Sequence, residues 1–108
     1  MRWARFRIAR QATESLLVGV EDWLPLSLQN SWVAVSGYVT PAVYRDPLGV
    51  VWLRGRVQGG SGPVAVLPLR HRPEGLERFA SCEVGVDGTI TSLASVVELS
   101  GIAFRPKG

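Results

Sequence analysis

The fold is constrained most by one stretch of the sequence, Tyr44 to Gly60, which reads YRDPLGVVWLRGRVQGG. Its first part, Asp46-Pro47-Leu48-Gly49, has the chemistry of a tight turn: an aspartate that caps, a proline that presets φ and a glycine that accepts a positive φ. The run Val50–Val57 that follows is rich in β-branched and aromatic residues, which favour extended backbone. The stretch therefore predicts two strands joined by a tight turn.

Side chains alternate between the two faces of a strand, and this alternation assigns Val50–Val57 to a buried and an outer face. The buried face takes Val51, Leu53, Gly55 and Val57, and the outer face takes Val50, Trp52, Arg54 and Arg56. The same reasoning predicts that three residues near the carboxyl end belong to the core: Val97, Leu99 and Phe104.

Further strand-like runs recur along the chain, separated by turn residues, and 12 glycines and 7 prolines favour such a chain over a helical one. We expect an all-β fold, an antiparallel jelly-roll-like β-sandwich of about eight short strands. One of these runs begins at Trp32. The others are Val64–Pro68, Phe79–Val86, Thr89–Leu93 and Val96–Phe104.

Two dipeptides suggest how these runs are connected. Asp87-Gly88 lies between two strand-like runs and predicts a two-residue hairpin turn of type I′. Ser100-Gly101 lies where the apolar positions change phase, because Val97 and Leu99 alternate on one face and Ile102 and Phe104 on the other. We expect a bulge there that returns Ile102 and Phe104 to the core.

The amino-terminal part differs from the rest and suggests a division into an arm, residues 1–22, and a β-sandwich domain, residues 23–108. Within the arm, alternating basic and apolar residues predict a short strand, either an added edge strand or a segment that attaches the domain to a larger particle. The candidate docking residues of this arm are Arg5, Phe6, Arg7 and Ile8.

Catalytic chemistry has little support in the sequence. His71 is the only histidine, lies between two arginines and is expected to be an exposed loop residue without a catalytic partner. Cys82 is the only cysteine, which rules out a disulfide within one chain and indicates a buried core residue. The acidic residues are too scattered to form a metal site. We therefore expect no enzyme activity, no metal and no cofactor.

Trp52, Arg54 and Arg56 are the candidate binding residues, and two interpretations remain open. Alternating aromatic and cationic side chains can stack nucleobases or sugars and hold phosphates. They are also the residue types that anchor protein interfaces, with arginines paired to acids such as Glu83 or Glu98. We favour the interface, because 46% of the residues are hydrophobic, which is high for a small monomer.

From Leu28 onward the chain resembles a β-rich domain found at the carboxyl ends of bacteriophage tail and minor structural proteins. The family pattern opens with Leu and Asn-Gly-Trp, where this chain has Ser31 in place of glycine, and its later Leu-Pro-x-Gly-Tyr-Arg-Pro is altered at Arg70 and His71. The matching segments are Leu28–Trp32, Tyr44–Asp46, Val51–Gly60, Leu67-Pro68, Arg72-Pro73, Asp87–Ile90 and Val97–Phe104.

The resemblance implies a jelly-roll-like sandwich, a homotrimer and a place in a virion assembled in the host cytoplasm, at a fibre or spike tip that touches a host saccharide or protein. It implies no catalytic site. The alternatives are a capsid decoration protein of the same fold and a small single-stranded nucleic-acid binder. The expected partners are further copies of the chain and other virion proteins; nucleic acid and membrane insertion are not expected, since the charge of +3 is mild and no apolar run is long enough to span a bilayer.

Overall fold

The computed structural model describes residues 22–107, which form eleven strands and one short 3₁₀ helix, and no α-helix. The all-β, antiparallel character predicted from the sequence is confirmed. The residues predicted to dock the arm, Arg5, Phe6, Arg7 and Ile8, lie outside the described part of the chain. The elements are β1 (Leu24–Pro25), β2 (Val33–Ala34), β3 (Ala42–Arg45), β4 (Val51–Arg54), β5 (Arg56–Gln58), β6 (Pro63–Val66), η2 (Leu69–His71), β7 (Glu77–Arg78), β8 (Cys82–Val84), β9 (Thr89–Ser92), β10 (Val96–Glu98) and β11 (Ala103–Phe104).

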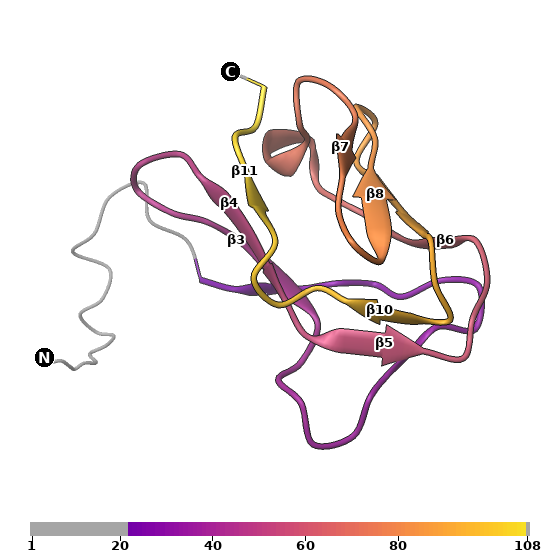
Figure 1. The fold of residues 1–108 in the computed structure, drawn as a ribbon. Coiled ribbons are helices and arrows are strands. Elements are labelled where there is room, and N and C mark those ends of the chain that lie inside the picture. Colours follow the sequence, from indigo (N-terminus) through magenta and orange to yellow (C-terminus); the bar gives the residue numbers. More distant parts are fainter. Residues whose placement is uncertain (1–21, 108) are drawn as a thin grey trace, which may run out of the picture.

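The eleven strands form three small sheets, whereas the sequence predicted about eight strands (Figure 1). Sheet A has the order β1-β3-β4-β11, sheet B the order β10-β5-β2 and sheet C the order β6-β9-β8-β7. The difference arises because several of the longer runs predicted as single strands are interrupted. For example, the run Phe79–Val86 contains only β8, since the Phe79 amide donates to the Cys82 carbonyl and closes a tight turn between β7 and β8.

The most consequential interruption lies at Gly55, where the run Val50–Val57 leaves sheet A as β4 and enters sheet B as β5. Gly55 has a φ of +104°, which L side chains rarely adopt. A Cβ at this position would lie 2.6 Å from Cα of Pro41 and 2.8 Å from its backbone nitrogen. Only glycine therefore fits this corner of the chain.

The returning chain crosses between the same two sheets opposite Gly55 (Figure 1). The amides of Leu99 and Ser100 both donate to the Gly55 carbonyl, and the Gly55 amide donates to Oγ of Ser100 at 2.9 Å. The Ile102 amide donates to the Leu99 carbonyl and closes a turn in which Gly101 has a φ of +88°. The predicted return of Ile102 and Phe104 to the core is confirmed, and a tight turn produces it.

One apolar core joins the three sheets, and all six residues predicted for it are buried: Val51, Leu53, Val57, Val97, Leu99 and Phe104. Cys82 is also buried as expected, and burial raises the pKa of its thiol to about 11. His71 corrects an expectation: it is 3% exposed, because η2 turns its side chain inward, and so it is not an exposed loop residue.

The tight turns differ from the sequence-based assignment in one instructive way. Asp87-Gly88 does not form a type I′ turn, because Asp87 does not have the positive φ that this turn requires; the turn spans Gly85–Gly88, and only Gly88 has a positive φ. The Asp46–Gly49 turn has the same hydrogen-bond pattern, with Gly49 at +87°. Two consecutive positive φ angles occur instead at Asn30 and Ser31.

We expect Gly55→Ala to lower the free energy of unfolding by more than about 3 kcal/mol, because the methyl group adds a clash with Pro41 to a strained φ. The matched control is Gly101→Ala, which has a similar positive φ but nothing within 4 Å of the added methyl group, and should cost only about 1–2 kcal/mol. Chemical denaturation measures both values. Equal losses for the two variants would contradict the close approach at the corner.

Candidate functional site

The outer face of sheet A carries a row of aromatic side chains, which we call the aromatic row: Trp23, Tyr44 and Trp52. Trp52 on β4 pairs directly with Tyr44 on β3. Trp23 immediately precedes β1, and its ring centroid lies 5.2 Å from that of Tyr44, a spacing at which aromatic pairs attract each other. Strand pairing thus brings together three rings that are distant in the sequence.

The alternation of side chains explains why this row faces outward. Val43 pairs with Leu53, and both side chains are buried in the core, so their neighbours Tyr44 and Trp52 point to the opposite face. Trp52 is 39% exposed, and Tyr44 is half-buried. The aromatic row therefore packs on sheet A, and its outward side is accessible to a partner.

Arg54 belongs to the same face and is held against the aromatic row. Its guanidinium carbon lies 4.4 Å from the centroid of the Trp23 ring, a cation–π contact worth about 0.5–1 kcal/mol at partly exposed sites. Its Nε atom is buried and has no hydrogen-bond partner among the described residues. The side chain is thereby fixed and partly desolvated before any partner arrives.

Asp46 orients the Trp52 side chain of the aromatic row and stabilises the turn between β3 and β4. Its Oδ1 atom accepts hydrogen bonds from the amides of Leu48 and Val50, and its Oδ2 atom accepts one from Nε1 of Trp52 at 3.0 Å. These bonds, the one from Trp52 above all, lower the pKa of the Asp46 carboxyl below its ordinary value of 3.8. The sequence predicted Asp46 as a turn cap but gave no sign that it also orients Trp52.

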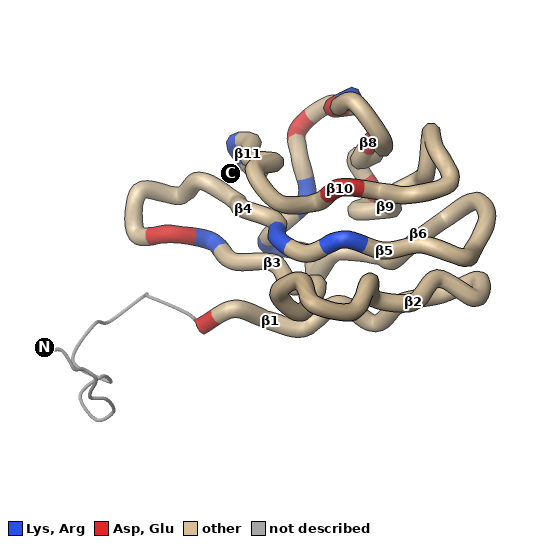
Figure 2. The backbone as a smooth tube through the Cα atoms, turned by 60° about the horizontal axis from the view of Figure 1, so that its bottom comes forward, with Lys and Arg blue, Asp and Glu red and all other residues tan. Residues whose placement is uncertain are grey.

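Arg56 is separated from the other two predicted site residues, because the corner at Gly55 places it on β5 in sheet B. Its Nε atom donates to Oε1 of Glu98 at 2.6 Å, a bond that raises the pKa of Arg56, and its guanidinium lies 4.5 Å from the Tyr38 ring centroid. Figure 2 shows the basic position on β5 beside the acidic position on β10. The sequence predicted that such an arginine pairs with an acid across a subunit interface, but Arg56 pairs with Glu98 of its own chain.

The predicted site residues therefore fall into two groups. Trp52 and Arg54 share the outer face of sheet A, whereas Arg56 belongs to a separate cluster with Glu98 and Tyr38. Sequence reasoning missed Trp23 and Tyr44 as members of the aromatic row. The proline that follows Leu24 marked an extended segment there, but only the pairing of β1 with β3 reveals where Trp23 lies.

Within residues 22–107, no group of three or more His, Cys, Asp or Glu side chains is arranged to hold a metal ion. The described part of the chain also contains no helix that is long and apolar enough to cross a membrane. No protein-family model, curated protein or solved structure matches the chain.

We expect acid to break the bond between Asp46 and Trp52. A carboxyl whose pKa is lowered by folding stabilises the native state above its unfolded pKa and loses this contribution as the pH falls through its folded value. Titration of the folded protein downward from pH 6 should therefore shift the Nε1–H resonance of Trp52 with a midpoint below 3.8.

Asp46→Asn should abolish this transition of the Trp52 resonance. The control is Asp87→Asn, which removes the other turn carboxyl whose pKa is lowered and should leave the transition in place. A Trp52 resonance that responds identically in the wild type and in Asp46→Asn would show that the carboxylate does not orient the indole.

Proposed function

We propose that the chain is a non-catalytic structural module of a bacteriophage virion, a component of a tail fibre or spike tip that acts in host attachment as a homotrimer. The jelly-roll-like arrangement is part of the same proposal. The observation that carries it is the aromatic row with Arg54: an ordered, half-exposed surface of the composition that anchors protein interfaces.

Exposed apolar side chains beyond the row support a second copy of the chain as its partner. Val33, Tyr38 and Val39 are each at least half exposed, and Val96 on the edge strand β10 is 40% exposed. A small monomer rarely leaves so much apolar surface in water, whereas a subunit covers it on assembly. A heterologous contact closed by a three-fold axis would place the aromatic row of one subunit against a different patch of the next.

The motif residues support the phage assignment through the positions they occupy. Gly55 forms the corner between sheets A and B, and Gly101 forms the turn opposite it. Gly60 packs against Trp32, since a Cβ there would lie 2.5 Å from Cγ of that indole. Three glycines of the resembling pattern thus lie where the backbone conformation or a close contact favours glycine, which is compatible with the proposed assignment.

Sedimentation equilibrium on the purified chain tests the trimer. The expected mass is about 35 kDa, three times the 11.7 kDa of one chain, as for a closed three-fold assembly. Trp52→Ala should weaken association by at least about 2 kcal/mol per truncated interface anchor. A mass of one chain across a wide concentration range would contradict the proposal.

The control for this variant is Leu76→Ala, which truncates a side chain that is 62% exposed on the loop before β7 and should leave the mass unchanged. Circular dichroism on both variants separates loss of assembly from loss of fold. Labelled antibody on purified particles then tests the location, and a signal confined to the head rather than the tail would replace attachment by capsid decoration.

A further inference from the structure

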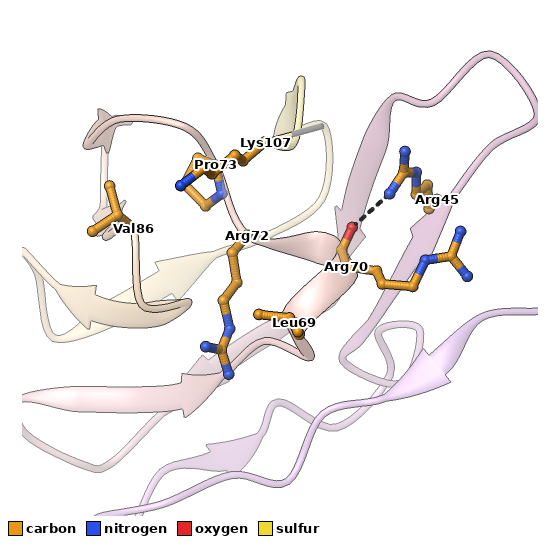
Figure 3. A pocket seen from close by; sticks show the side chains of 7 residues that line it. All are labelled: Arg45, Leu69, Arg70, Arg72, Pro73, Val86 and Lys107. Carbon is orange, nitrogen blue, oxygen red and sulfur yellow. Dashed lines mark hydrogen bonds between the residues drawn. The ribbon is translucent and has the colours of Figure 1, made fainter.

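A hollow of about 560 Å³ lies on a part of the surface that the aromatic row does not include, and four separate segments contribute to it (Figure 3). They are the end of β3, the segment from η2 to Pro73, the turn after β8 and the segment that follows β11. Four of the seven lining residues are cationic, namely Arg45, Arg70, Arg72 and Lys107, and none of the lining residues is acidic. The hollow is therefore a site of concentrated positive charge.

Arg72 is fixed in this hollow by the backbone around it. Its Nε atom donates to the Leu67 carbonyl at 3.0 Å, and its own carbonyl accepts from the Lys107 amide at 2.9 Å. Its side chain also packs closely on Gly88, where a Cβ would lie 2.8 Å from Nε of Arg72. These contacts occupy Nε and leave the two terminal nitrogens of the guanidinium as donors for a ligand.

Arg70 lies at one end of the hollow beside Arg45, whose Nη1 atom donates to the Arg70 carbonyl at 2.9 Å (Figure 3). A third guanidinium is close by, since Arg45 and Arg105 both approach within about 4 Å of the Cβ position of Gly49. Cationic side chains gathered in this way create a positive potential that attracts anions. The charge of Arg72 helps to lower the pKa of the nearby Asp87 carboxyl. The Asp87 carboxylate accepts a hydrogen bond from the Thr89 amide within its own turn.

Apolar side chains complete the lining. Leu69 is 77% exposed and Val86 is 60% exposed, so both present apolar surface beside the cations. Guanidinium groups match the paired oxygens of phosphates and carboxylates, and mixed apolar and charged hollows of this size suit small molecules.

From these observations we propose that the hollow binds a small oxyanion-bearing molecule, a phosphate ester or a carboxylate that carries an apolar part. The site does not depend on the proposed virion function. Arg45 points to the opposite side of β3 from Tyr44, so that ligand binding and contact through the aromatic row use different faces.

A titration of the full chain followed by ¹⁵N–¹H correlation spectra tests this site, with pyrophosphate and citrate as separate probes at constant ionic strength. We expect the amides of Leu69, Arg72 and Val86 to shift with at least one probe, with a dissociation constant below about 10 mM. A response to pyrophosphate alone identifies a phosphate site, and a response to citrate alone identifies a carboxylate site.

Arg70→Gln should weaken binding at least about fivefold, roughly 1 kcal/mol. The matched control is Arg78→Gln, which removes the same charge from the pair of Arg78 with Glu83 on β7 and β8 and should leave affinity unchanged. Lys107→Gln provides a second variant of the lining should Arg70→Gln fail to fold.

Two results would overturn the proposal: neither probe binds below about 10 mM, or Arg78→Gln loses as much affinity as the variants of the hollow. The second result would show that affinity depends on the net charge of the chain and not on the residues of the hollow. Neither result bears on the trimer, which is measured without any ligand.

Discussion

The crossing between sheets A and B at Gly55 is the constraint on which the rest of the structure depends. Two antiparallel segments pass from one sheet to the other at the same point, and both are tied to a single residue: the Gly55 carbonyl accepts two amides, and its own amide donates to Ser100. No side chain fits there, because Pro41 occupies the space. The core continues across this point, with Leu53 on one side and Val57 on the other.

The same corner determines what kind of surface the molecule presents. In an uninterrupted strand, Trp52, Arg54 and Arg56 would lie in one line on the same face of a sheet. Such a line of side chains could bind an extended polyanion such as single-stranded nucleic acid. The corner instead assigns Arg56 to sheet B, where Glu98 neutralises it, and leaves Arg54 stacked on Trp23. The outer face of sheet A is consequently an aromatic surface with one ordered cation, while four further cationic side chains line the hollow around Arg70 and Arg72.

Local patterns in the sequence were sufficient to predict those features of the fold that depend on neighbouring residues alone. The buried set from Val51 to Phe104, the turn at Asp46 and the buried Cys82 follow from alternation, turn chemistry and side-chain volume. The failures have a common physical cause, which is that they depend on non-local contacts. The break at Gly55 requires Pro41 to approach from another segment, and the burial of His71 requires η2 to pack on the sheets. Of the three residues of the aromatic row only Trp52 was predicted, since Tyr44 and Trp23 join it through the pairing of β3 with β4 and of β1 with β3.

The most direct test of the corner is the strand register on its two sides, measured from cross-strand nuclear Overhauser effects between backbone protons. Val97 faces Val57 in sheet B, and Phe104 faces Val51 in sheet A. The segment from Val97 to Phe104 is therefore one residue longer than the segment from Val51 to Val57 that it faces. We predict contacts for both pairs. If the ladder ran through without the extra residue, Phe104 would face Val50 instead of Val51, and that contact would contradict the account.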